Sequence, residues 1–268
     1  MTLTSLPRLV ATDLDGTLLR SDGKCSERTR AALAAVESAG IQVVLVTARP
    51  PRWLHELADL VGEHGVVLCA NGAFVYDVRS RRILHEDCLP VGVVMEIAVD
   101  LRNALPGIAF AVESRSGFGR ERGFGDAYTT SQDVAAALLE ELLDPLPGKM
   151  LARCNDVPAD RFHRVVEQVV GDRAVVSYSG AYGLAEISAV GVTKASALER
   201  WCATQGIDSE DVFAFGDMPN DLPMLEWAGW SVGVANAHPA VLASVDEVCA
   251  SNDDDGVAQV LEAALARR

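Results

Sequence analysis

The chain has 268 residues, 49% of them hydrophobic, which is enough to bury one large core or a core with an inserted second domain. Its 23 basic and 38 acidic residues give a net charge of -15, which argues against a nucleic-acid-binding surface. No apolar run approaches the ~18 residues of a membrane span, the start lacks a basic region before an apolar stretch, and the 6 cysteines form no CxxC pair, so a soluble cytoplasmic protein with free thiols is expected.

The first third of the chain alternates short apolar runs with a helical pattern. Strands are predicted over 9–12, 41–46 and 66–70, and a helix over 26–39 with Ser26 as its N-cap and Gly40 as its stop. The uninterrupted apolar run 42–46 is typical of a strand buried on both faces of a parallel sheet. Asn71-Gly72 predicts a tight turn into a strand over 74–76.

From about residue 89 the pattern changes to a mixture of helices and strands. Helices are expected over 91–104, 133–143 and 159–170, and strands over 108–112, 149–153, 174–178 and 184–187. Between them, 114–126 reads as a Gly/Arg-rich loop, whose arginines are compatible either with contact to an anionic substrate or with a plain surface loop. We interpret residues 87–187 as an inserted α+β cap domain.

After residue 190 the earlier alternation returns. Helices are expected over 194–205, 221–227, 238–243 and 257–266, with strands over 212–215 and 231–234, and the acidic run Asn252–Asp255 reads as a helix-capping turn. Residues 1–86 and 188–268 therefore form one discontinuous core domain. The fold class is α/β, with a doubly wound, mainly parallel, Rossmann-like core sheet and the inserted cap, and the cleft between the domains is the expected binding site.

Two carboxylates stand at the end of the first predicted strand. Asp13 and Asp15 follow the apolar run 9–11, and like charges two residues apart on a strand raise each other's pKa unless a cation or hydrogen-bond donors compensate them. Mg²⁺ is the ion that suits one or two carboxylates together with water and phosphate oxygens. The sequence therefore predicts a magnesium site that handles phosphate.

Other polar residues end the neighbouring strands. Thr47 and Arg49 follow the second apolar run, Asp217, Asn220 and Asp221 follow the strand over 212–215, and Lys194 opens the helix before that strand. Ligands of open α/β sheets bind beyond the carboxyl ends of the strands, so these side chains are expected to converge. Carboxylates, a hydroxyl and an ammonium are the groups that phosphoryl transfer needs.

These segments, in this order, resemble the four motifs of the haloacid dehalogenase superfamily. The match comprises Asp13-x-Asp15-Gly-Thr-Leu, Thr47, Lys194 and Gly216-Asp217-x-x-Asn220-Asp221. The long insertion, the Asn71-Gly72-Ala73 turn and the tail segments 235–239 and 252–257 further resemble the Cof-type phosphatase branch, which carries a large α/β cap.

The resemblance implies a role for each residue. Asp13 would be the nucleophile that forms an aspartyl-phosphate, and Asp15 the general acid and base, with its backbone carbonyl reaching the metal. Phosphate would be held by Thr47, Lys194 and Asn220, Mg²⁺ by Asp13, Asp15, Asp217 and Asp221, and substrate contacts are open for Arg49 and Asn71. Asp221 is compatible with direct ligation or with a supporting position.

The expected activity is Mg²⁺-dependent hydrolysis of a small organophosphate, a sugar phosphate being our first choice. A large cap disfavours macromolecular substrates. Three alternatives remain open: a phosphotransferase or phosphomutase with the same intermediate, a phospho-accepting receiver, and a non-catalytic module that binds a phosphometabolite. No pattern in the sequence indicates an oligomeric state.

Overall fold

The computed structural model describes residues 6–58, 60–61, 65–125, 136–179 and 182–266. The chain divides into two compact units, which we call the core unit (Met1–Leu84 with Thr193–Arg268) and the inserted unit (His85–Val192). No helix in the described ranges has the length and apolar character to cross a bilayer.

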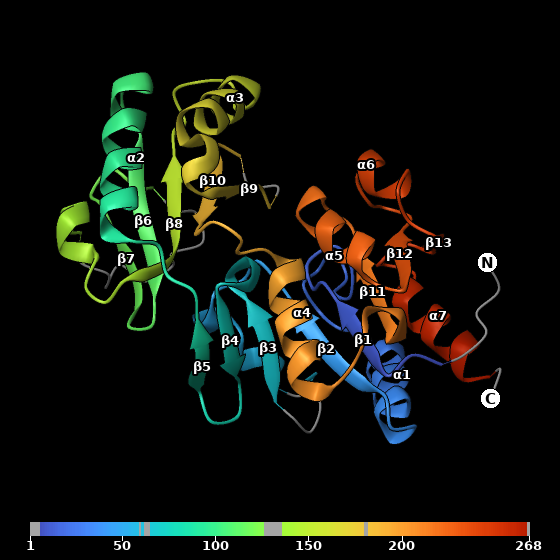
Figure 1. Cartoon of the computed structure of the whole chain (residues 1–268). Coiled ribbons are helices and arrows are strands. Elements are labelled where there is room, and N and C mark those ends of the chain that lie inside the picture. Colours follow the sequence, from blue (N-terminus) through green and yellow to red (C-terminus); the bar gives the residue numbers. More distant parts are fainter. Residues whose placement is uncertain (1–5, 59, 62–64, 126–135, 180–181, 267–268) are drawn as a thin grey trace. The chain divides into compact units, whose positions relative to one another are not determined.

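The core unit is built on an eight-stranded sheet in the order β13-β12-β11-β1-β2-β3-β4-β5 (Figure 1). The strands from β13 to β3 pair in parallel, and β4 joins β3 antiparallel. Four of them, β1, β3, β11 and β12, are buried along their whole length. The bounds are β1 Leu9–Thr12, β2 Gln42–Val46, β3 Val66–Cys69, β4 Phe74–Asp77, β5 Arg82–Glu86, β11 Val212–Gly216, β12 Trp230–Val234 and β13 Glu247–Cys249.

Helices cover both faces of this sheet. The β1-α1-β2 and β11-α5-β12 connections run in opposite directions across the sheet, so right-handed crossovers place α1 and α5 on opposite faces. Helix α7 packs on α1 and α4 packs on α5. The bounds are α1 Glu27–Ser38, α4 Lys194–Gln205, α5 Leu222–Trp227, α6 Pro239–Leu242 and α7 Gly256–Leu265. The doubly wound α/β fold is thus confirmed.

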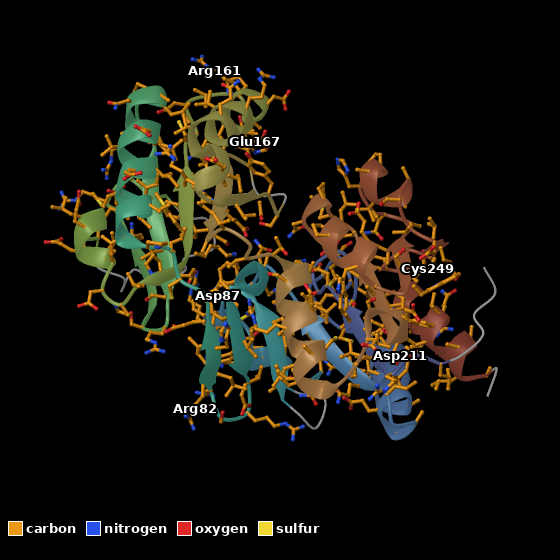
Figure 2. All side chains as sticks on the ribbon, in the orientation of Figure 1. Arg82, Asp87, Arg161, Glu167, Asp211 and Cys249 are labelled. Carbon is orange, nitrogen blue, oxygen red and sulfur yellow. The ribbon has the colours of Figure 1, made fainter. Side chains whose placement is uncertain are left out.

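The strand order reverses between β1 and β11, which defines the topological switch point. In Figure 2 the label of Asp211 marks the amino-terminal edge of the sheet, directly before β11, and the label of Cys249 marks the carboxyl edge, at the end of β13. Asp13 and Asp217 directly follow the adjacent strands β1 and β11 at the carboxyl edge. Any ligand of this fold is expected there.

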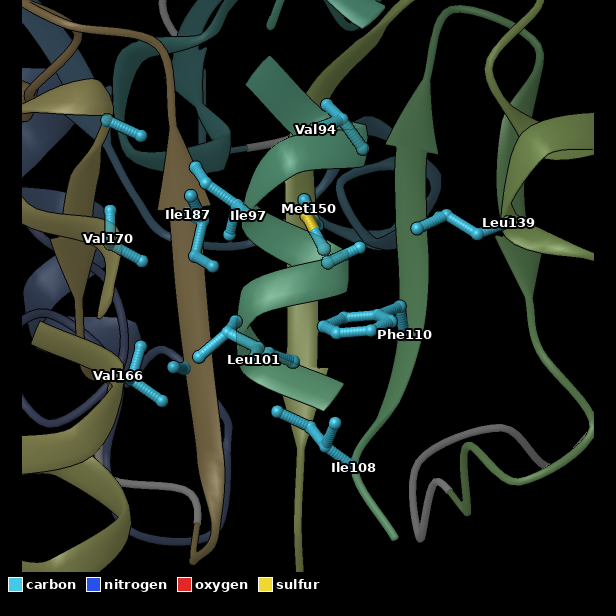
Figure 3. Close-up of a cluster of buried hydrophobic side chains, with 14 of the residues drawn as sticks. Val94, Ile97, Leu101, Ile108, Phe110, Leu139, Met150, Val166, Val170 and Ile187 are labelled. Atoms are coloured by element: carbon cyan, nitrogen blue, oxygen red, sulfur yellow. The ribbon is translucent and has the colours of Figure 1, made fainter. Parts of the chain in front are cut away.

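The inserted unit has a five-stranded antiparallel sheet in the order β7-β6-β8-β10-β9. Helices α2 and α3 cover one face, and Figure 3 shows their apolar side chains, such as Leu101 and Val166, gathered over Phe110 and Ile187 of the strands. The bounds are α2 Val91–Ala104, α3 Ala159–Val170, β6 Ala109–Ser114, β7 Gly117–Arg120, β8 Pro147–Arg153, β9 Val175–Ser177 and β10 Leu184–Ser188.

The other face of the inserted sheet combines apolar and charged side chains. Phe124 packs there against Ala109 and Ala111. Lys149 and Glu186 lie on strands β8 and β10 and form a fully buried ion pair, with 2.8 Å between Nζ and Oε2. The two charges compensate each other, Oγ of Ser179 also donates to Oε1 of Glu186, and buried Glu113 stands opposite Lys149 on β6.

Two sequence predictions in the inserted unit are wrong. Within the predicted loop 114–126, Gly117–Arg120 is strand β7 and Phe124 is buried, so part of this segment belongs to the sheet, and residue 126 lies outside the described residues. Instead of a helix over 133–143, the described residues form only a 3₁₀ turn at Leu139–Leu142, and 133–135 lie outside the described residues. Leu139 in this turn and Leu143 directly after it are buried, whereas Leu138 is exposed, so one turn buries only part of the leucines that produced the helical pattern.

Further 3₁₀ turns stand at Pro51–Trp53, His55–Leu57, Ala70–Gly72, Gly171–Arg173, Ser209–Asp211 and Pro219–Asp221. Two of them, Ala70–Gly72 and Pro219–Asp221, directly follow β3 and β11 and therefore lie at the edge of the sheet that carries the polar residues.

Candidate active site

Three buried carboxylates and one buried ammonium meet beyond the ends of β1 and β11. The Nζ atom of Lys194 lies 2.6 Å from Oδ1 of Asp13 and 2.6 Å from Oδ1 of Asp221. One ligand oxygen each from Asp13, Asp217 and Asp221 lies within 4.8 Å of the other two. The four side chains come from three segments, the loop after β1, the start of α4 and the turn after β11, so the fold itself creates the cluster.

The local structure explains why each group stays in place. Lys194 is the first residue of α4, directly after its N-cap Thr193, whose side chain accepts a hydrogen bond from the backbone N–H of Ser196. Asp221 accepts two backbone hydrogen bonds at Oδ2, from Asp217 N at 3.1 Å and Met218 N at 3.0 Å. Asp221 therefore closes the turn after β11 and orients Lys194, which fits a supporting position as well as direct ligation.

Burial controls the electrostatics of this cluster. Desolvation raises the pKa of Asp13 well above its ordinary value, and the neighbouring carboxylates of Asp221 and Asp217 raise it further against the opposing effect of Lys194. Desolvation, followed by Asp221, also raises the pKa of Asp217 to about 6. Burial alone would lower the pKa of Lys194, but Asp13 and Asp221 together raise it, so the amine is charged at neutral pH.

The loop after Asp13 passes directly over Asp217. The Oγ1 atom of Thr17 donates a 2.8 Å hydrogen bond to Oδ1 of Asp217. Gly16 has a φ of +82°, and a Cβ at this position would lie 2.4 Å from Oδ2 of Asp217. Only glycine fits between the loop and the carboxylate, which explains the Asp-Gly-Thr sequence on physical grounds. The contribution of Thr17 was not predicted, although it stands within the recognised motif.

Asp15 lies outside the buried cluster. Its carboxylate accepts two hydrogen bonds from Arg49, from Nε at 2.7 Å and Nη2 at 2.5 Å, and its side chain is 56% exposed. The hydrogen bonds to Asp15 also raise the pKa of Arg49. The predicted metal set therefore divides: Asp13, Asp217 and Asp221 converge through their carboxylates, whereas the carboxylate of Asp15 pairs with Arg49. Two residues predicted to act on the substrate thus contact each other.

The remaining predicted residues lie on the turns after β2, β3 and β11. Thr47 is buried, and its Oγ1 accepts a hydrogen bond from the backbone N–H of Arg49 at 3.0 Å. Asn71 donates its backbone N–H to the carbonyl of Thr47 at 3.0 Å, and its Oδ1 accepts a 3.2 Å hydrogen bond from Nδ2 of Asn220. The turns after these three strands are therefore bonded to one another.

The turn after β3 is held in an uncommon conformation. Ala70 and Asn71 both have positive φ values, 53° and 58°, followed by Gly72 at 99°. A Cβ on Gly72 would lie 2.3 Å from the carbonyl oxygen of Thr193, so this turn packs against the start of α4. The predicted Asn-Gly turn is confirmed, and its packing helps place Lys194.

The donor set suits a hard divalent cation. Three buried aspartates face one lysine, which leaves an excess of negative charge in a desolvated place. Carboxylate oxygens at mutual distances below 5 Å are the ligands that Mg²⁺ takes, alongside water and phosphate. The residues present can therefore hold a metal ion.

The comparisons with known proteins agree with this geometry. A family model described as haloacid dehalogenase-like hydrolase matches residues 10–261. The 5-amino-6-(5-phospho-D-ribitylamino)uracil phosphatase YitU of Bacillus subtilis (strain 168) is 30% identical over 265 residues, covering 96% of this chain and 97% of the relative. The pyridoxal phosphate phosphatase YbhA of Escherichia coli (strain K12) is 29% identical over 271 residues, covering 95% and 97%.

Solved structures share the fold. The phosphatase BT1666 of Bacteroides thetaiotaomicron, a member of the haloalkanoate enzyme superfamily, aligns with a TM-score of 0.83 at 21% identity, covering 98% of this chain and 97% of that structure.

The chain therefore belongs to the haloacid dehalogenase-like hydrolase family. The resemblance drawn from the four motifs, to this superfamily and its Cof-type branch, is confirmed. The predicted enzyme class, a phosphoric monoester hydrolase, is confirmed as well, since the family is one of hydrolases and the full-length relatives are named phosphatases.

Proposed function

We propose that this enzyme hydrolyses phosphate monoesters of small organic molecules, with Mg²⁺ and through an aspartyl-phosphate on Asp13. The observation that carries the proposal is the convergence of Asp13, Asp217, Asp221 and Lys194 at the switch point of the sheet. The two relatives named above act on pyridoxal phosphate and on a ribityl phosphate, both small phosphate esters. A sugar phosphate remains our first choice within this class.

In the first step, a carboxylate oxygen of Asp13 attacks phosphorus and the bond from phosphorus to the leaving oxygen breaks. We assign Oδ2 to the attack, because Lys194 holds Oδ1 at 2.6 Å. In this step Asp15 acts as the general acid and gives a proton to the leaving oxygen. In the second step, Asp15 takes a proton from water as the water oxygen attacks phosphorus, which releases phosphate and restores Asp13.

The other residues bind and orient. Lys194, Thr47 and Asn220 would hold the phosphoryl oxygens, and Asp13 and Asp217 would hold the metal with Asp221 supporting them. When bound, Mg²⁺ supplies positive charge that screens the phosphate from the carboxylates. Because Arg49 forms a bidentate pair with Asp15, we assign Arg49 both to orienting this acid and to meeting the substrate.

We further assign the inserted unit, His85–Val192, the role of a cap that selects the organic part of the substrate. The six cysteines are free, which is compatible with the reducing cytoplasm that the sequence suggests.

A screen over small phosphate esters tests the proposal, run with Mg²⁺ or with chelator and beside Asp13→Asn and Asp15→Asn. We expect phosphate release only with Mg²⁺, none from Asp13→Asn, and a phosphorylated Asp13 in rapidly quenched wild-type enzyme. Asp211→Asn, on a partly exposed residue at the other edge of the sheet, is the matched control and should keep the wild-type rate.

Each alternative predicts a different result in the same experiment. Transfer to an added alcohol that exceeds release of phosphate would favour a phosphotransferase. A long-lived phosphoaspartate with slow turnover would favour a receiver, and binding without turnover a non-catalytic module. Activity that persists in Asp13→Asn or without a divalent metal would refute the mechanism.

A further inference from the structure

The loop that carries Asp15 is fastened to a segment near the other end of the chain. We call residues Gly16–Ser21, which directly follow the proposed general acid Asp15, the acid loop. We call residues Asn252–Asp255, which include three aspartates, the acidic turn. The acidic turn precedes α7, and more than 230 residues of sequence separate it from the loop that it contacts.

Two asparagines bind backbone carbonyls of the acid loop. Nδ2 of Asn236 donates to the carbonyl oxygen of Gly16 at 2.7 Å, and Nδ2 of Asn252 donates to that of Leu19 at 2.8 Å. The backbone N–H of Asn252 donates to Oδ1 of Asn236 at 2.9 Å, so the two asparagines support each other. Because the two asparagine amides bind backbone carbonyls, these hydrogen bonds hold the backbone of the acid loop in place rather than its side chains.

Two aspartates bind the next part of the loop, each through both oxygens. Arg20 donates from Nε and Nη2 to Asp255 at 3.1 and 2.7 Å. Ser21 donates from its backbone N–H and its Oγ to Asp253 at 2.8 and 2.7 Å. These hydrogen bonds lower the pKa of both aspartates, so both are ionised at neutral pH.

Helix capping does not account for this arrangement. Asp255 stands at the N-cap of α7, yet its backbone is left-handed, with a φ of 58°, and its side chain caps no backbone group of that helix. The sequence-based interpretation of the acidic turn as a simple cap is therefore wrong for Asp255. Its carboxylate turns instead to Arg20 of the acid loop.

The position of Asp15 depends on this loop. Asp15 stands beyond β1, its side chain is more than half exposed, and its backbone pairs with Leu19 in an isolated bridge. The same loop carries Thr17, which donates to Asp217. A shift of the loop therefore moves the acid and a contact of the buried cluster together, and displacements of about 1 Å at such a site cost about 100-fold in rate.

We propose that Asn236, Asn252, Asp253 and Asp255 are positioning residues that hold Asp15 where it can protonate the leaving oxygen. This inference rests on the proposed function, in which Asp15 is the general acid. Positioning of this kind acts on the proton transfer, since none of the four residues has to touch the substrate.

The test compares two esters that differ in their need for an acid. An alkyl phosphate requires a proton on its leaving oxygen as the bond to phosphorus breaks, whereas p-nitrophenyl phosphate releases a stable phenolate without one. Single-turnover release of the alcohol or phenol, with enzyme in excess and Mg²⁺ present, measures the first step alone. The variants are Asp253→Ala and Asp255→Ala, with the milder Ser21→Ala, which removes one hydrogen bond to Asp253.

The matched control is Glu262→Ala. Glu262 forms an equally bidentate pair with Arg28, at 2.9 and 2.5 Å, and this pair joins α7 to α1. It therefore reports what the loss of an ion pair on α7 does to the enzyme in general.

We expect the acidic-turn variants to lose about 10- to 100-fold in the single-turnover rate with the alkyl ester and far less with p-nitrophenyl phosphate. Ser21→Ala should show the same selective loss at smaller size, and Glu262→Ala should change neither rate. Asp255→Glu should recover part of the alkyl rate.

Equal losses with both esters, or no loss with either, would overturn the inference and reduce the acidic turn to a structural element. If Asp253→Ala and Asp255→Ala fail to fold, Ser21→Ala decides the question, through the ratio of its single-turnover rate loss with the alkyl ester to that with p-nitrophenyl phosphate. A wild-type enzyme that cleaves neither ester would instead overturn the proposed function, so the two failures are distinguishable.

Discussion

The buried carboxylate of Asp217 should destabilise the metal-free protein at neutral pH. Its pKa is raised from an ordinary 3.8 to about 6, first by burial and then by Asp221. Between these two values the folded protein holds a proton that the unfolded chain has released, so stability falls as the pH rises through this window and stays low above it. At 1.36 kcal/mol for each pH unit, the loss is about 3 kcal/mol.

The substitution Asp217→Asn removes this penalty and keeps the shape of the side chain. The amide oxygen can still accept the hydrogen bond from Thr17. At about pH 8 with chelator, we expect the free energy of unfolding to rise by up to about 3 kcal/mol relative to wild type. At about pH 4 the difference should fall below about 1 kcal/mol, because this pH is close to the ordinary pKa of 3.8 and the folded wild-type carboxyl is protonated.

Urea denaturation followed by circular dichroism, at both pH values and with chelator or Mg²⁺, measures the effect. Mg²⁺ should stabilise wild type at the higher pH and do so far less for Asp217→Asn, because the variant lacks one charged ligand. Asp211→Asn, which removes a carboxylate that is 40% exposed, is the control and should stay within about 0.5 kcal/mol of wild type.

Two outcomes would refute this reasoning. A variant that is less stable than wild type at the higher pH without metal would mean that other contacts compensate the buried charge of Asp217. Equal stabilisation of variant and wild type by Mg²⁺ would mean that Asp217 is no ligand.

Three further predictions address other residues. Lys194→Met should lower stability by about 3–5 kcal/mol in urea denaturation, since it leaves two buried carboxylates without their cation, and the deficit should shrink at acidic pH. Gly16→Ala should reduce kcat strongly with little change in KM, because the new Cβ would lie 2.4 Å from Oδ2 of Asp217; an unchanged kcat would argue against a tight loop. Lys149→Met should cost about 3–5 kcal/mol, whereas Lys149→Met with Glu186→Leu should cost much less, and equal losses on thermal unfolding would contradict a compensated pair.

The sequence predicts the parallel strands and their polar ends because both are local features. The run 43–46 of β2 is apolar throughout and the next residue, Thr47, is polar. Adjacent residues in the sequence therefore indicate both the strand and its functional end. Parallel strands bring these ends to one edge, and Asp13 and Asp217 stand side by side there because β1 pairs with β11. Fold class and convergence therefore follow from short-range patterns and topology.

Strands at the margins of the two sheets escaped prediction for a physical reason. β5 alternates little and is largely exposed, β7 is rich in glycine, and β13 has only three residues. Strands of this kind are formed by pairing with a neighbour rather than by their own composition. The sequence of such a strand contains no pattern that identifies the neighbouring strand with which it pairs.

Contacts between side chains that are distant in sequence could not be predicted either. Asp15 and Arg49 are 34 residues apart, and Arg20 and Asp255 are 235 apart. Residue types suggested separate roles for Asp15 and Arg49, whereas the structure joins them in one bidentate pair. Whether two charged groups meet depends on loop paths, which pattern and spacing do not specify.

The acidic cluster links stability to function. Three buried carboxylates with a single bonded lysine are unfavourable for the metal-free fold, and the pKa of Asp217 is raised by the same burial and charge. In the proposed function, the same excess of negative charge would attract a divalent cation into a protein whose net charge of -15 repels anionic substrates. A substitution that stabilises the cluster, such as Asp217→Asn, should therefore remove the cation and with it the means to admit phosphate. A gain in stability with a loss of turnover is the expected outcome of one change, because both arise from the same charge.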